Sequence, residues 1–178
     1  MMRSLVEDAL AREPTAGAAA SEAAFMTQDQ RVDAELESIL RNLRTNIKII
    51  GVGGGGTNTI QRIYDEGIVG AELYAANTDA QHLLQLHAPH KILLGRRVTR
   101  GLGAGALPQI GEEAAREAED ELKKLLADTH ICFVTCGLGG GTGTGGAAVV
   151  ARTAKELGAL TIAVATMPFR GEGKMRME

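Results

Sequence analysis

Residues 139–145 read GGGTGTG and stand between an apolar run, Ile131 to Cys136, and an amphipathic segment, Ala147 to Leu157. This succession is typical of a buried strand that turns into a helix, and we expect the helix to begin near Gly146. Glycines let the backbone approach a phosphate, and the first N–H groups of a helix point at it. A flexible linker is disfavoured, because linkers are not bracketed by a strand and a helix. We therefore predict a phosphate cradle here.

A second glycine loop, GVGGGG at 51–56, follows another apolar run, Ile47 to Val52, and opens another helix. Gly51, Gly53 and Gly56 also match G-x-G-x-x-G, the fingerprint of dinucleotide-binding enzymes. Glu72 or Asp79 then stands about 20 residues on, where such enzymes carry an acid for the ribose. A nicotinamide-dependent oxidoreductase is thus one alternative, although it leaves GGGTGTG without a role. A tight turn that binds no ligand is the other alternative for this loop.

The third loop, RGLGAGALP at 100–108, precedes a long acidic segment. Three such loops favour a polyphosphate ligand, and in a parallel sheet they gather at the carboxyl ends of the strands. The sequence lacks the P-loop pattern G-x-x-x-x-G-K-[ST], because Gly173-Lys174 has Pro168 at the position of the first glycine. Walker-type chemistry is therefore excluded.

Short apolar runs alternate with amphipathic segments from Thr45 onwards, which favours parallel β-α-β units. Aromatic residues make up only 3% of the chain, so the core must consist mainly of Ala, Val, Ile and Leu. We predict helices over Gly111 to Ala127 and Ala147 to Leu157. The predicted strands are Ile47 to Val52, Glu72 to Ala76, Lys91 to Leu94, Ile131 to Cys136 and Leu160 to Thr166.

The first 44 residues differ from the rest. Residues 1–30 have few large apolar side chains and are predicted to form a mobile tail. Residues 31–44 carry an apolar stripe at helical spacing, from Val32 and Leu36 to Leu43, which predicts one helix. We expect this helix to dock on the body of the protein, and a partner-binding helix is the alternative.

The net charge is −3, and residues 1–30 account for all of it. The neutral remainder gives no electrostatic reason to expect nucleic acid or an anionic membrane as a partner. Without a secretory signal or a long apolar run, a cytoplasmic protein without direct membrane insertion is expected. Cys132 and Cys136 lie roughly 13 Å apart in an extended run, too far to bridge, and are expected to be reduced core residues.

Several motifs together resemble one family. GGGTGTG is similar to the tubulin signature motif in its FtsZ form, and the neighbouring motifs agree in sequence order. These are GVGGGGTN at 51–58, ANTDAQ at 76–81, TRGLGAGA at 99–106 and MPFRGEGKMRME at 167–178. The chain is therefore identified as a member of the FtsZ/tubulin family, most like its archaeal branch. The resemblance implies an α/β fold with a Rossmann-like, doubly wound parallel sheet, and an incomplete FtsZ-type GTP-binding domain at 45–178.

The resemblance also implies a site for GTP or GDP, with Mg²⁺ carried by the nucleotide and no direct metal ligand. The α and β phosphates would be held by Gly54, Gly55, Gly56, Thr57 and Asn58, and from the other side by Gly140, Gly141, Thr142, Gly143 and Thr144. Gly103, Ala104 and Gly105 would sense the γ-phosphate. Glu172 and Arg176 would contact the ribose and the neighbouring phosphate, and Asn77 and Asp79 would lie near the nucleotide and its Mg²⁺. Asp79 is alternatively the N-cap of the next helix.

Two departures from the family qualify these expectations. Leu107 stands where many relatives carry Asn, which makes the edge of the γ-phosphate loop less polar. The chain also ends at Glu178, before the guanine-contacting helix, the acidic catalytic loop that the next subunit supplies in the family's filaments, and the family's second domain. No catalytic residue is identified, and we expect GTP binding with negligible hydrolysis by this chain alone.

The family implies a cell-division (cytokinesis) GTPase that assembles into head-to-tail filaments at the division site, with other division proteins as partners. A truncated, non-catalytic module that caps or tunes such filaments is the alternative. A metal site is not expected from His82, His87 and His90, because the first two lie five apart on an expected helix and the third follows Pro89.

Overall fold

The computed structural model describes residues 32–34, 36, 45–169 and 171. The chain divides into two compact units, Met1–Arg44 and Thr45–Glu178. In the first unit the described residues are helical, and Val32 and Leu36 are about half exposed. The predicted tail, 1–30, and most of the predicted helix, 31–44, lie outside the described residues. The docking of that helix stays a prediction.

The second unit is built on a five-stranded parallel sheet with the strand order β3-β2-β1-β4-β5. Its strands are β1 (Ile47–Val52), β2 (Glu72–Asn77), β3 (His90–Leu93), β4 (Ile131–Gly137) and β5 (Leu160–Thr166). The chain moves outward from β1 to β3 on one side, then returns to β4 on the other. This reversal defines a doubly wound sheet, so the predicted fold class is confirmed.

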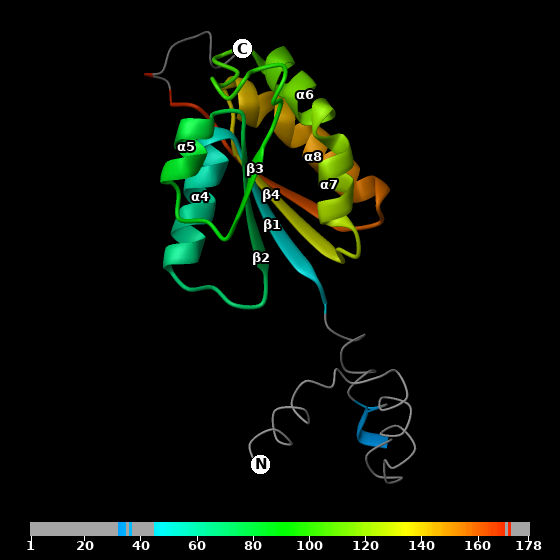
Figure 1. Cartoon of the computed structure of the whole chain (residues 1–178). Coiled ribbons are helices and arrows are strands. Elements are labelled where there is room, and N and C mark those ends of the chain that lie inside the picture. Colours follow the sequence, from blue (N-terminus) through cyan, green and yellow to red (C-terminus); the bar gives the residue numbers. More distant parts are fainter. Residues whose placement is uncertain (1–31, 35, 37–44, 170, 172–178) are drawn as a thin grey trace, which may run out of the picture. The chain divides into compact units, whose positions relative to one another are not determined.

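Helices cover both faces of this sheet (Figure 1). One face carries α4 (Gly53–Asp65) and α5 (Ala80–Gln85), and the other carries α6 (Pro108–Glu117), α7 (Glu119–Leu126) and α8 (Ala147–Glu156). Within the described residues no helix is long and apolar enough to cross a membrane.

The predicted single helix from Gly111 to Ala127 is wrong, because the structure contains two helices that meet at Ala118. At Ala118 the backbone leaves the helical region, with φ −92° and ψ 8°. The buried side of α6 is Gly111, Ala114 and Ala115, which lets its backbone approach the neighbouring segment closely, whereas α7 buries leucines. The break at Ala118 coincides with this change from small to large buried side chains. The first helix also begins three residues early, because Pro108 fits the first helical position.

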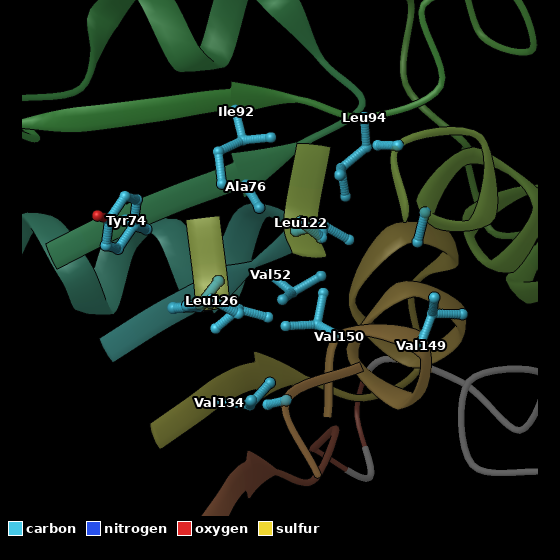
Figure 2. Packing of buried hydrophobic residues seen from close by; sticks show 14 of the residues in the cluster. Val52, Tyr74, Ala76, Ile92, Leu94, Leu122, Leu126, Val134, Val149 and Val150 are labelled. Atoms are coloured by element: carbon cyan, nitrogen blue, oxygen red, sulfur yellow. The ribbon is translucent and has the colours of Figure 1, made fainter. Parts of the chain in front are cut away.

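The main core lies between the sheet and the helices α7 and α8 (Figure 2). Val52 and Val134 from the sheet pack with Leu122 and Leu126 of α7 and with Val150 of α8. A second cluster, around Ile60, Leu73 and Leu83, fills the other face. The central strands β1, β2 and β4 are mostly buried and need apolar residues on both sides, which explains their uninterrupted apolar runs in the sequence.

The two cysteines are buried and unpaired, as predicted. Burial raises the pKa of the Cys132 thiol to about 11, and it also raises the pKa of Cys136. Both thiols are therefore protonated core residues.

Candidate functional site

The three glycine loops meet at the carboxyl ends of the strands, as the sequence predicts. They border a cleft with two lobes that share Gly54, Gly105 and Thr142. The larger lobe has a volume of about 480 Å³ and the smaller one about 320 Å³. Pockets of a few hundred Å³ are typical of small-ligand sites.

The larger lobe lies between the loop after β1 and the loop after β4. Gly54 and Gly55 line it from one side, and Gly140 to Gly143 line it from the other. Residues 166–169, which follow β5, form a further wall. The smaller lobe is bordered by Asn77 to Asp79, by His82 and by Gly103 to Gly105.

Both lobes rely on backbone N–H groups to bind an anion. No Lys or Arg among the described residues lines either lobe. Two helical segments begin at the cleft, α4 after Val52 and the π-helix η1 (Thr142–Gly146) after Gly141, and neither has a side-chain cap or an acidic residue in its first turn. The first amides of a helix have no partner within it, and the helix dipole makes them attractive to anions. The cleft is therefore suited to phosphate groups.

The glycines of the loops fall into two groups. Some pack backbone against backbone: a Cβ at Gly143 would stand 2.5 Å from the Gly137 carbonyl oxygen, and one at Gly56 would stand 2.3 Å from that of Thr135. Gly54 and Gly140 differ, because a Cβ there would meet no atom within 4 Å, although both residues line the larger lobe. Glycines such as Gly56 and Gly143 therefore allow the backbone segments that form the cleft to pack together, whereas Gly54 and Gly140 leave space for a ligand in it.

The helix after β4 begins earlier than predicted. Helical backbone starts at Thr142 with η1, not near Gly146, and continues into α8. The run of glycines has low helix propensity, and the close approach of α6 stabilises its helical form instead: a Cβ at Gly145 would stand 1.9 Å from the Pro108 carbonyl oxygen. π-Helical turns are rare in proteins, and those that occur are often found at functional sites.

Threonine hydroxyls stabilise the loop after β4 and join it to the end of β2. The Oγ1 atoms of Thr78 and Thr142 lie 2.6 Å apart and are buried. Thr144 Oγ1 accepts the Gly139 N–H at 3.1 Å. These bonds hold the loop after β4 in shape and fix it against the end of β2.

The third loop is tied to the end of β2 and to the loop after β4. Gly103 donates its N–H to the Thr78 carbonyl at 3.1 Å, and the Gly105 carbonyl accepts the Gly141 N–H at 2.9 Å. Leu107 lines neither lobe, is exposed, and stands at the N-cap of α6 without a side-chain hydrogen bond. Its departure from the family pattern therefore affects the start of α6 and not the wall of the cleft.

Asp79 caps the helix that follows it, as one interpretation of the sequence predicts, and it also lies at the cleft, as the other predicts. Its Oδ1 accepts the His82 N–H at 3.0 Å, so it is the N-cap of α5. It also lines the smaller lobe, where it is the only carboxylate among the described residues. Asn77 is buried beside it, and its Oδ1 accepts the Thr78 N–H at 2.8 Å.

Four of the predicted site residues support the cleft without lining it. Gly56 is buried and Asn58 is exposed. Thr57 donates its hydroxyl to the Gly53 carbonyl at 2.9 Å, and Thr144 accepts the Gly139 N–H within its own loop. Glu172 and Arg176 lie outside the described residues.

Sequence reasoning missed several residues at the cleft, namely Thr78, His82, Gly137, Leu138 and residues 166–169. His82 was considered only as a metal ligand. His87 does not share its helix, because α5 ends at Gln85, which corrects the prediction. No group of three or more potential metal-ligating side chains occurs among the described residues.

The chain is similar to known proteins over most of its length. The family model described as "Tubulin/FtsZ family, GTPase domain" matches residues 46–178. Cell division protein FtsZ 1 of Archaeoglobus fulgidus is 58% identical over 98% of this chain and 47% of its own length. Cell division protein FtsZ of Aquifex aeolicus is 62% identical over 74% of this chain and 36% of its own length. The chain thus spans about half the length of the archaeal relative.

The chain is also similar in structure to solved proteins of the same family. A mutant FtsZ of M. jannaschii is 53% identical with a TM-score of 0.77, over 82% of this chain and 44% of that one. A structure titled as an empty FtsZ dimer of M. jannaschii has a TM-score of 0.75 at 52% identity, over 85% of this chain and 43% of that one. CetZ from Methanosaeta thermophila, at 22% identity and a TM-score of 0.65, shares the fold.

Proposed function

Because this chain belongs to the tubulin/FtsZ family, whose GTPase domain matches residues 46–178, we propose that its two-lobed cleft binds GTP or GDP. The observation that carries the proposal is the meeting of two uncapped helical N-termini and three glycine loops around one cleft, which no Lys or Arg among the described residues lines. Such a cleft holds several phosphate groups by backbone N–H groups.

In this proposal each lobe binds a different part of the nucleotide. Gly54 and Gly55, with Gly140 to Gly143, hold the α and β phosphates in the larger lobe. Gly103 to Gly105 contact the γ-phosphate in the smaller lobe. The Asp79 carboxylate there would repel a phosphate, unless a hard cation with oxygen ligands stands between them. This supports Mg²⁺ as the ion that accompanies the nucleotide.

Cleavage of the terminal phosphate needs a positioned water and stabilisation of the charge that develops on the γ-phosphoryl oxygens. The glycine loops supply the stabilisation. The Asp79 carboxylate is already an N-cap, and no other acid among the described residues lines the cleft. We propose that this chain alone binds GTP with negligible turnover, since a missing general base costs about 10² to 10⁴ in rate.

The family likeness supports a role in cell division for the whole protein, with self-association into head-to-tail filaments at the division site. The dimer from M. jannaschii supports self-association, and other division partners follow only from the family resemblance. The two alternatives, an NAD-dependent oxidoreductase and a filament-capping module, are not favoured by these comparisons. Glu72 is also excluded as a ribose-binding acid, because it begins β2 and lies at the opposite end of the strand from the cleft.

Calorimetric titration of the purified chain with GTP, GDP, ATP and NAD in Mg²⁺ tests the proposal. We expect both guanine nucleotides to bind in the same range, and ATP and NAD to bind at least about tenfold more weakly, a difference of 1.4 kcal/mol. Phosphate release from GTP should remain at background. NAD binding as tight as GTP binding would overturn the proposal.

A further inference from the structure

The ring of His82 lies between three elements that border the smaller lobe. His82 is the third residue of α5, and Asp79 caps that helix through the His82 N–H. Its ring atom Nδ1 stands 3.0 Å from Nδ2 of Asn77, at the end of β2, and farther, 3.4 Å, from Oγ1 of Thr57 on α4. Its Nε2 stands 3.1 Å from Oδ1 of Asn58, on α4.

The neighbouring hydrogen bonds assign the ring proton to one of the two nitrogens. Asn77 Oδ1 already accepts the Thr78 N–H, so the Asn77 side chain turns its NH₂ group towards the ring. Nδ1 of His82 must then accept a hydrogen bond, and the ring proton is on Nε2. Nε2–H donates to Asn58 Oδ1, an acceptor. In its uncharged form the ring is therefore held in one tautomer.

This arrangement joins the two sides of the cleft. Asn58 is in the second turn of α4, whose first turn carries Gly54 in both lobes. Asn77 lies in the strand that leads to Asp79 and, through Thr78, to the Gly103 amide of the third loop. The His82 ring is the side chain that bonds to both α4 and β2 at this place, and it lines the smaller lobe itself.

We propose that His82 is a positioning residue for the terminal phosphate: its hydrogen-bonded ring sets the spacing between α4 and β2 and thereby the width of the smaller lobe. This inference rests on the proposed function, because the smaller lobe is the one assigned to the γ-phosphate. GTP places a phosphate in that lobe and GDP does not. Loss of the ring therefore weakens GTP binding more than GDP binding.

Two substitutions separate the hydrogen bonds from the bulk of the ring. His82→Leu removes both bonds, whereas His82→Gln keeps an acceptor for Asn77 and a donor for Asn58. His87→Leu is the matched control, because His87 is exposed and lies outside both lobes. GTP and GDP affinities are measured for the four proteins, with a thermal melt of each to establish that it is folded.

His82→Leu should weaken GTP binding about tenfold and GDP binding less than about threefold, as expected for the loss of two modest hydrogen bonds. His82→Gln and His87→Leu should stay within about threefold of the parent for both nucleotides. Equal loss of GTP and GDP binding, unchanged binding in His82→Leu, or a His82→Gln protein that behaves like His82→Leu would overturn the proposal.

The nucleotide-free protein provides a second, independent test. Long-range ¹H–¹⁵N spectra distinguish a protonated ring nitrogen from an unprotonated one, and the His82 signals are identified by their absence in His82→Gln. For the uncharged ring we expect the Nε2–H tautomer, and an Nδ1–H tautomer would overturn the inference even if His82→Leu fails to fold. If the parent protein binds no GTP while the Nε2–H tautomer is found, the proposed function fails and the hydrogen-bonded bridge between Asn58 and Asn77 stands.

Discussion

Gly54→Ala separates nucleotide binding from folding. Gly54 is the second residue of α4, has no positive φ, and its Cβ would meet no protein atom within 4 Å. Alanine is a better helix former than glycine and restricts the unfolded chain, so the substitution should stabilise the protein by about 0.5 kcal/mol. For a chain of this length that gain raises Tm by about 1–2 °C.

The same methyl group should weaken nucleotide binding. Gly54 lines both lobes, and its exposed backbone is where a phosphate must approach the first turn of α4. Displacement of the phosphate from one charge-assisted hydrogen bond costs about 1.5–3 kcal/mol, which is roughly a 10- to 150-fold rise in Kd.

Calorimetry with GTP and a thermal melt measure the two effects on the same protein. Thr59→Ala is the control, since Thr59 is also in α4 but lines neither lobe, and it should leave GTP affinity unchanged. Gly143→Ala should instead lower both stability and affinity, because its Cβ would stand 2.5 Å from the Gly137 carbonyl oxygen. A Gly54→Ala protein that is as stable as the parent and binds GTP equally well would refute the reasoning.

Three further predictions concern stability and reactivity. Leu107→Asn should stabilise the protein by about 1 kcal/mol in urea unfolding, because it supplies the missing side-chain cap of α6 at a residue with extended backbone; no gain would contradict that assignment. Thr78→Val and Thr142→Val should each cost about 1–3 kcal/mol, while the double variant should cost less than the two together, because the pair leaves no orphaned hydroxyl; strict additivity would show that the 2.6 Å contact is not a shared hydrogen bond. The thiols of Cys132 and Cys136 should resist a thiol reagent at pH 8 until the protein unfolds, because burial raises both pKa values and keeps the native thiols protonated; rapid labelling of folded protein would contradict their burial.

The sheet and its loops were predictable because their physical signals are local. Both β1 and β5 appear in the sequence as short apolar runs and were predicted with their observed ends, although β1 is largely buried and β5 is largely exposed. Glycines between a strand and a helix located the cleft, since parallel strands bring such loops to one edge.

Other features depend on contacts that the sequence does not display. The apolar periodicity continues across Ala118, so nothing in the pattern indicates the break between α6 and α7. Helical backbone at Thr142 is stabilised by the close approach of α6, which no glycine-rich segment reveals by itself. His82 gives no signal of its own, because its role comes from Asn58 and Asn77 on separate elements.

Amide chemical-shift mapping during a titration with GTP and Mg²⁺ tests the central claim most directly. The account predicts that the largest shifts occur at Gly54, Gly105 and Gly140 to Gly143, which border the cleft from three loops. The amides around Lys48 and Glu72, at the other ends of the strands, should remain unchanged. Shifts confined to that opposite edge, or no shifts at saturating GTP, would contradict the assignment of the cleft.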